Sequence, residues 1–302
     1  MGAAILVDNI LKDNYDARPR VMTVTEVDSG GSAVSSSNVQ EGYGFANLFD
    51  NMGHTSFKIG AGGGQVIHQI DFGATVKANG FALYGHNFTS SKGLKIEVST
   101  DNVTYSPFIA DAPNVSDGIF TAPNGRGFAF GAKGSLDSFR YLRIHTVGFD
   151  GSEHLSVLRI GLWLDEGLDI SAPFIPPYFT PHEFTTKRNN KGNLIGGQIR
   201  KMPTKLSIKI NALSESDLES TTAEAVSNDA EGRNFIQYAS DRMAREPFFL
   251  MWKQRDTSDT AAVQAADEGE MYYCTVDRSL KQPAFSSGTI LNWSFRLIGY
   301  TE

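Results

Sequence analysis

The chain has 302 residues, 40% of them hydrophobic and 20% charged, so it is long enough for two domains of ordinary size. Its formal net charge of −7 argues against nucleic acid as the main partner, because phosphate binding favours a basic surface. No run of about 18 apolar residues occurs, so no membrane insertion is expected. A single cysteine, Cys274, excludes a disulfide within the chain and indicates assembly in a reducing cytoplasm.

The first 40 residues are expected to form an N-terminal arm and the first strands. Residues 3–7 are apolar, residues 21–27 alternate in the way of a half-buried strand, and a Ser/Gly-rich loop follows at 29–37. No basic segment or Ala-x-Ala site marks a leader peptide.

Residues 41–166 are expected to form a first β-sandwich. Six strand candidates lie at 65–72, 80–86, 93–99, 127–130, 140–147 and 155–164. Clusters rich in Gly, Ser, Asn and Asp separate many of them, as at 89–93 and 148–152. Short strands with frequent turns are typical of an all-β sandwich.

Residues 167–182 are predicted to be a stiff linker. Four prolines lie among apolar residues there: Pro173, Pro176, Pro177 and Pro181. The apolar residues should dock on one domain or on a neighbouring subunit.

Residues 183–302 are predicted to be a second β-sandwich that carries one α-helix. A turn at 190–193 favours a hairpin between 183–187 and 194–199, and residues 206–212 alternate clearly. The helix should span 229–245, with an apolar stripe formed by Phe235, Ile236, Ala239 and Met243. Strands at 248–253, 271–276 and 290–300 complete a mainly β chain whose two parts should each fold alone.

No catalytic motif is present. The sequence has no phosphate-binding Gly-Lys-Ser/Thr, no His-Glu-x-x-His and no Gly-x-Ser-x-Gly. The six histidines lack metal-ligand spacing, and the paired acids lie in the linker and in a polar loop. We therefore expect neither an enzyme nor a cofactor.

One segment carries a family resemblance. Residues 46–51 read Ala-Asn-Leu-Phe-Asp-Asn, residues 55–57 read Thr-Ser-Phe, and the last strand reads Val-Leu-Arg-Ile-Gly-Leu-Trp at 157–163. In this order they resemble a discoidin-like (coagulation factor 5/8 C-type) jelly roll of the galactose-binding kind. Related members often hold calcium between this Asp and a glutamate on the last strand. Here Arg159 stands where the glutamate is expected, so the resemblance implies an Asp50–Arg159 pair in place of a metal.

The resemblance also implies that ligands bind loops at one end of the sandwich. Aromatic rings there stack on sugars, while His, Asn and Asp bond hydroxyl groups. The candidate residues are Tyr43, Phe45, His54, His86, Asn87, Phe88, Phe149 and Asp150. Two alternatives remain open: the loops are buried between subunits, or Phe88 and Phe149 anchor them.

The C-terminal half resembles, by its strand–helix–strand order, the tube-forming fold of long-tailed phages. This resemblance implies a non-enzymatic distal or minor tail protein of a phage tail or baseplate. The chain would form a homo-oligomeric ring in the virion tail beside other tail proteins, with the jelly roll free to contact protein or host glycan. The alternative is a carbohydrate-binding module protein of a bacterial surface or extracellular system.

Overall fold

The computed structural model describes most of the chain. The described residues are 4–17, 22–28, 32, 38–60, 66–88, 92–109, 115–116, 119–121, 128–164, 170–171, 182–201, 204–214, 235–252, 263–264, 271–278, 280–281, 284–287 and 290–299. They form a ten-stranded sheet, a seven-stranded sheet and a two-stranded hairpin. Strands dominate these described residues, with helix α3 in their C-terminal half, so the mainly β fold class is confirmed.

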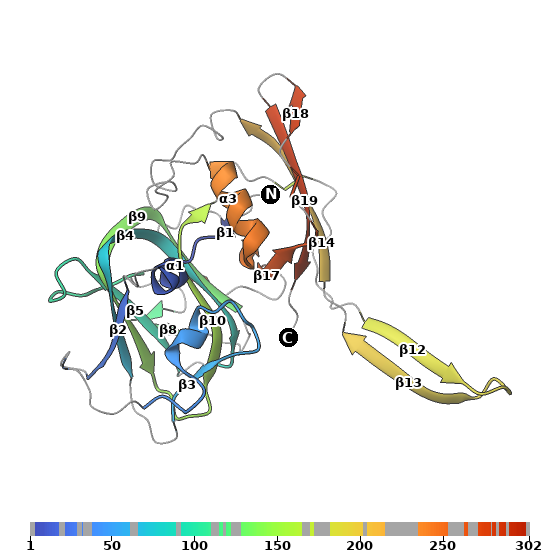
Figure 1. Cartoon of the computed structure of the whole chain (residues 1–302), viewed down its shortest axis with the longest axis horizontal. Helices are drawn as coiled ribbons and strands as arrows, with labels where there is room; N and C mark the ends of the chain where they lie inside the picture. Colours follow the sequence, from blue (N-terminus) through green and yellow to red (C-terminus); the bar gives the residue numbers. More distant parts are fainter. Residues whose placement is uncertain are drawn as a thin grey trace.

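Two long strands, β4 (Ile67–His86) and β9 (Phe128–Val147), organise the jelly roll (Figure 1). The ten-stranded sheet runs β3-β10-β4-β9-β5-β8-β7, with β2 on β4, β6 on β5 and β16 on β9. The remaining strands are β2 (Thr23–Val27), β3 (Phe57–Lys58), β5 (Gly93–Ser99), β6 (Ser106–Pro107), β7 (Val115–Ser116), β8 (Ile119–Thr121), β10 (His154–Gly161) and β16 (Val263–Gln264).

The β4–β9 ladder changes register twice, between Asp71 and Val76 and again between Ala78 and Gly80. Gly73, in the first shift, has a φ of +73°, which glycine adopts without steric cost. The shifts let one continuous sheet enclose an apolar core that reaches from Phe57 through Phe72 to Leu158. Segments 65–72 and 80–86, predicted as two strands, are thus one irregular strand.

The N-terminal segment contributes to both parts of the molecule. Helix α1 (Ile10–Asp16) is capped by Asn9, whose side chain accepts a hydrogen bond from the Lys12 backbone N–H at 3.4 Å. Ile10, Leu11 and Met22 lie in the jelly-roll core. Strand β1 (Ala4–Leu6) instead pairs with β11 (Trp163–Leu164) and with β15 (Phe248–Met251) in the other sheet.

The seven-stranded sheet has the order β11-β1-β15-β17-β19-β14, with β18 on β19. Its remaining strands are β14 (Thr204–Ser214), β17 (Met271–Val276), β18 (Ala284–Ser287) and β19 (Ile290–Gly299). Helix α3 (Phe235–Arg245) buries Tyr238, Ala239 and Met243 in the core on this sheet. The predicted helix start at 229–234 and the side chains of Phe235 and Ile236 lie outside the described residues.

A third apolar cluster joins the jelly roll to the second sheet. Its members come from β4 and β10 on one side and from β1, β11, β15 and β17 on the other: Leu6, Ala82, Tyr84, Val157, Trp163, Phe249, Met251, Met271 and Tyr273. The Tyr84 and Tyr273 rings stack across it, with centroids 5.2 Å apart. The two parts therefore meet through buried apolar side chains.

Arg159 lies at this junction and is fully buried. It donates hydrogen bonds to the Val7 carbonyl at 2.9 Å and to Asn51 Oδ1 at 2.8 Å, and it lies 3.5 Å from Glu246 Oε2. Asp50 instead accepts hydrogen bonds from the Met52 N–H and the Thr55 hydroxyl, both at 2.7 Å. The predicted Asp50–Arg159 pair is wrong. Asp50 closes its own turn, while the Arg159 guanidinium contacts Asn51 and Glu246, the residue after helix α3.

The predicted hairpin is present. Strands β12 (His182–Arg188) and β13 (Leu194–Lys201) pair antiparallel and extend away from the rest of the molecule (Figure 1). Ahead of it, Ile170 forms an isolated bridge with Ile210 of β14. The four linker prolines lie outside the described residues.

Candidate ligand-binding surface

The strand ends place several predicted ligand residues at one end of the jelly roll. Register partners there are Gly93 with Val147, Leu155 with His86, and His154 with Lys58. The loops that follow β4 and β9 therefore lie beside the start of β10. This arrangement brings together Asn87 and Asp150.

Asn87 and Asp150 hold these loops through hydrogen bonds. The Asn87 side chain donates to the Ser152 carbonyl at 2.9 Å and accepts from the His154 N–H at 2.7 Å. Asp150 accepts from the Ser152 N–H at 3.1 Å and pairs with Lys92 Nζ at 2.9 Å. The Lys92 hydrogen bond lowers the pKa of the Asp150 carboxyl below its ordinary value. These contacts connect the loop after β4 to the start of β10 and to Lys92.

Glu153 adds a buried carboxylate to the same loops. It pairs with the Lys92 ammonium and accepts a hydrogen bond from the Asp150 N–H at 2.7 Å. Burial opposes its ionisation, but the hydrogen bonds from Lys92 and Ser152 bring its pKa below the ordinary value. The Glu153 and Asp150 carboxylates in turn raise the pKa of Lys92, so the three groups stay charged together at neutral pH.

Four of the predicted ligand residues are buried, and three of them, His86, Phe88 and Phe149, lie together beneath these loops. Phe88 is 0% and Phe149 5% exposed, and their rings lie 5.1 Å apart. His86 is also buried, lies 4.6 Å from the Phe88 ring, and its Nδ1 accepts a hydrogen bond from the Phe88 N–H at 3.3 Å. Both rings pack inward beneath the loops, which supports the alternative that Phe88 and Phe149 anchor them and contradicts a sugar-stacking role.

Tyr43 has a half-exposed aromatic ring at this end of the molecule. The Lys58 ammonium lies over it, 4.3 Å from the ring centroid, and the Lys58 N–H donates to the Tyr43 carbonyl at 3.3 Å. In the ladder between β3 and β10, Lys58 lies opposite His154, whose side chain is half-buried. Burial lowers the pKa of His154, and the nearby Lys58 charge lowers it further, so this imidazole is neutral at pH 7.

Tyr43, Lys58, His154 and Asn87 thus follow one another along this end, and we call them the loop surface. Lys58 and His154 were missed in the sequence. Strand β3 has only two residues, and its pairing with β10 spans almost a hundred positions. A pattern-based analysis has no signal for such a contact.

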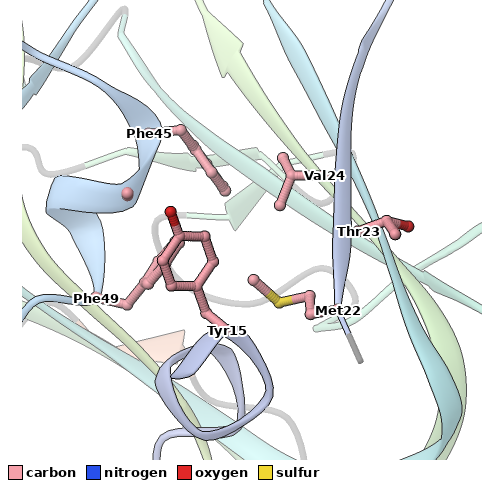
Figure 2. Close-up of a pocket in the computed structure, with 7 residues that line it drawn as sticks. Tyr15, Met22, Thr23, Val24, Phe45 and Phe49 are labelled. Carbon is pink, nitrogen blue, oxygen red and sulfur yellow. The ribbon is translucent and has the colours of Figure 1, made fainter. Parts of the chain in front are cut away.

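The other predicted residues lie near η1 (Phe45–Leu48). Phe45 is 9% exposed and lines an apolar pocket of about 430 Å³ between α1, β2 and η1 (Figure 2). The residues around it are Tyr15, Met22, Thr23, Val24, Phe45, Ala46 and Phe49. His54 is exposed in the turn that Asp50 closes.

In the parts of the chain that the structure describes, no three His, Cys, Asp or Glu side chains gather to hold a metal ion. Within the same residues, no helix is long and apolar enough to cross a membrane.

Comparison with known proteins gave similarities of fold. No family model and no curated protein matches the sequence. Among solved structures, CpGH89CBM32-6 produced by Clostridium perfringens is 14% identical, with a TM-score of 0.33, and the match covers 51% of this chain and 98% of that one. CBM32-1 from a family 31 glycoside hydrolase of Clostridium perfringens is 16% identical, with a TM-score of 0.35, over 47% and 95% of the two chains.

A third structure is chitosan-binding module 1, derived from a chitosanase/glucanase of Paenibacillus sp. IK-5. It is 17% identical, with a TM-score of 0.35, and the match covers 51% of this chain and 98% of that one. Each likeness spans about half of the present chain. At these identities and TM-scores, none of them identifies a family or a ligand for it.

Proposed function

We propose that the jelly roll binds a carbohydrate through the loop surface. The observation that carries this proposal is the half-exposed Tyr43 ring beside fixed hydrogen-bonding groups on neighbouring strands. Sugar sites combine such a ring, which packs against the apolar face of a pyranose, with a few polar groups that fix its orientation. In this proposal the chain acts by binding and is not an enzyme.

Each residue of the loop surface has a distinct role in this proposal. The Tyr43 ring supplies the apolar contact, and the Lys58 ammonium, with three donors, bonds ring hydroxyls. Neutral His154 offers one donor and one acceptor. Asn87 uses one amide hydrogen and one oxygen lone pair within the loop, which leaves its second hydrogen and second lone pair for a ligand.

A glycan array followed by calorimetry with the best glycan tests the proposal. Tyr43→Ala and His154→Ala should each weaken binding about tenfold or more, equivalent to about 1.4 kcal/mol. Tyr105→Ala is the matched control, since that ring lies 3.8 Å from the Arg143 guanidinium near the opposite end of β5. Its binding should be unchanged. Undiminished binding by Tyr43→Ala, or no binding to any glycan, would overturn the proposal.

A second candidate function is structural: a ring-forming protein of a phage tail or baseplate, located in the virion tail. The observation that favours it is the β12–β13 hairpin, which extends from the molecule with its described side chains exposed. Such a hairpin gains stability when it packs on another surface. Size-exclusion chromatography with light scattering is the test, and a strict monomer at every concentration would contradict this function.

A further inference from the structure

The β12–β13 hairpin stands as a separate two-stranded sheet. Its strands pair only with each other among the described residues, so each has one free edge of unpaired backbone groups. Every side chain described in it is exposed, including Ile195 at 67%. Isolated two-stranded hairpins are at best marginally stable in water, so a surface that covers this one would stabilise it.

The tip of the hairpin is well defined. The Asn189 side chain accepts hydrogen bonds from the backbone N–H groups of Lys191 at 3.0 Å and Asn193 at 2.9 Å. Gly192 has a φ of +83°, and the Arg188 guanidinium donates to its carbonyl at 2.9 Å. The turn is therefore built by its own contacts, which leave the lysine side chains on either side of it exposed.

The hairpin is basic while the rest of the chain is acidic. Residues 182–201 contain three lysines, two arginines and one glutamate, for a formal charge of +4. Because the whole chain carries −7, its remaining residues carry −11. Among the described residues, no carboxylate lies within ion-pair distance of Lys187, Arg188 or Lys191.

We propose that this hairpin is an arm that docks on a second copy of the chain, whose residues outside the hairpin carry the opposite net charge. The inference rests on the second candidate function and deepens it by naming the contact. A second copy presents the opposite charge to the arm, and Ile195 supplies an apolar side chain for the contact. Nucleic acid fits less well, because the −11 of the remaining chain repels a polyanion that the arm attracts.

The experiment compares two double variants of the full chain by sedimentation velocity. Lys187→Glu with Lys191→Glu reverses two charges on the arm. Lys205→Glu with Lys281→Glu is the control, because both lysines are exposed, lie on or beside the seven-stranded sheet, and change the net charge equally. Circular dichroism melts should show that both variants fold as the parent does.

We expect the parent chain to associate at about 50 mM salt and to dissociate towards 32.9 kDa at about 500 mM, where exposed charges are screened within a few ångströms. The arm variant should associate about tenfold or more weakly at low salt, and the control should behave as the parent. If the arm variant self-associates as tightly as the parent, the docking arm is overturned but the structural function is not. A parent that stays at 32.9 kDa overturns both the arm and the structural function. If the parent does not self-associate but binds a short DNA, and the arm variant loses that binding, the arm binds nucleic acid and the proposal is overturned.

Discussion

Lowering the pH from 7 to 5 should destabilise the protein through one buried histidine, His68. This side chain is 1% exposed and stacks on the Phe45 ring with centroids 4.0 Å apart, while Phe57 meets it edge-on at 5.3 Å. Neither ring nitrogen has a hydrogen-bond partner among the described residues. Burial therefore lowers the pKa of His68 from 6.5 to about 3.

The direction and size of the effect follow from proton linkage. Below pH 6.5 the unfolded chain binds a proton at this histidine and the folded chain does not, so stability is lost as the pH falls towards 3. At pH 5 the unfolded state has about 97% of this site protonated and the folded state about 1%. The resulting loss of unfolding free energy, relative to pH 7 and above, is about 2 kcal/mol.

Urea unfolding at pH 7, 6 and 5 measures this effect against two variants. His68→Leu places an apolar side chain of similar volume, without a titrating group, in the same site. Its unfolding free energy should therefore fall by about 2 kcal/mol less than that of the parent between pH 7 and 5. His54→Gln, at an exposed histidine, should track the parent. Equal pH dependence in the parent and His68→Leu would refute the reasoning. NMR titration of the His68 ring gives a second readout, and a midpoint near 6.5 in the folded protein would contradict it equally.

Three further predictions concern the loops and the junction. Phe88→Ala should cost about 3–5 kcal/mol of unfolding free energy, because it empties a core site, and a change below about 1 kcal/mol would mean that the ring is exposed in solution. Arg159→Met should cost a similar amount in urea unfolding, because it leaves the buried Val7 carbonyl and the half-buried Asn51 Oδ1 without this donor. Asp50→Ala should cost about 1 kcal/mol. Thermal melts with EDTA and with millimolar calcium should superimpose, because Asp50 already accepts two hydrogen bonds within its turn; a calcium-induced rise of several degrees would restore a metal site there.

The elements that depend on local patterns were predictable. Strand β5 spans 93–99 as expected, because alternation and flanking turn residues define it. The hairpin turn follows from the Asn, Lys and Gly at its tip. Helix α3 ends at Arg245, as expected for a residue near a following proline. In each case the residues that give the sequence pattern lie inside the element or within a few residues of its end.

The candidate site was less predictable, because its geometry depends on contacts across the chain. An aromatic residue in a loop gives no periodic signal for the direction of its side chain, so the sequence leaves open whether Phe88 and Phe149 face a ligand or anchor their loops. The structure shows that both are buried. The role of Arg159 was likewise hidden. Its partners Val7, Asn51 and Glu246 lie in three distant segments, and only the folded junction brings them together.

The division of the chain by packing also differs from the division by sequence order. Residues before 41 supply Ile10 and Leu11 to the jelly-roll core, while β1, from the same segment, lies between β11 and β15 in the other sheet. Polar contacts reinforce this connection, because the Tyr238 hydroxyl of α3 donates to the buried Asp8 at 2.7 Å. A fragment that starts near residue 40 therefore lacks part of its core and exposes the apolar junction. The buried junction thus joins the jelly roll to the seven-stranded sheet through side chains from both parts of the molecule.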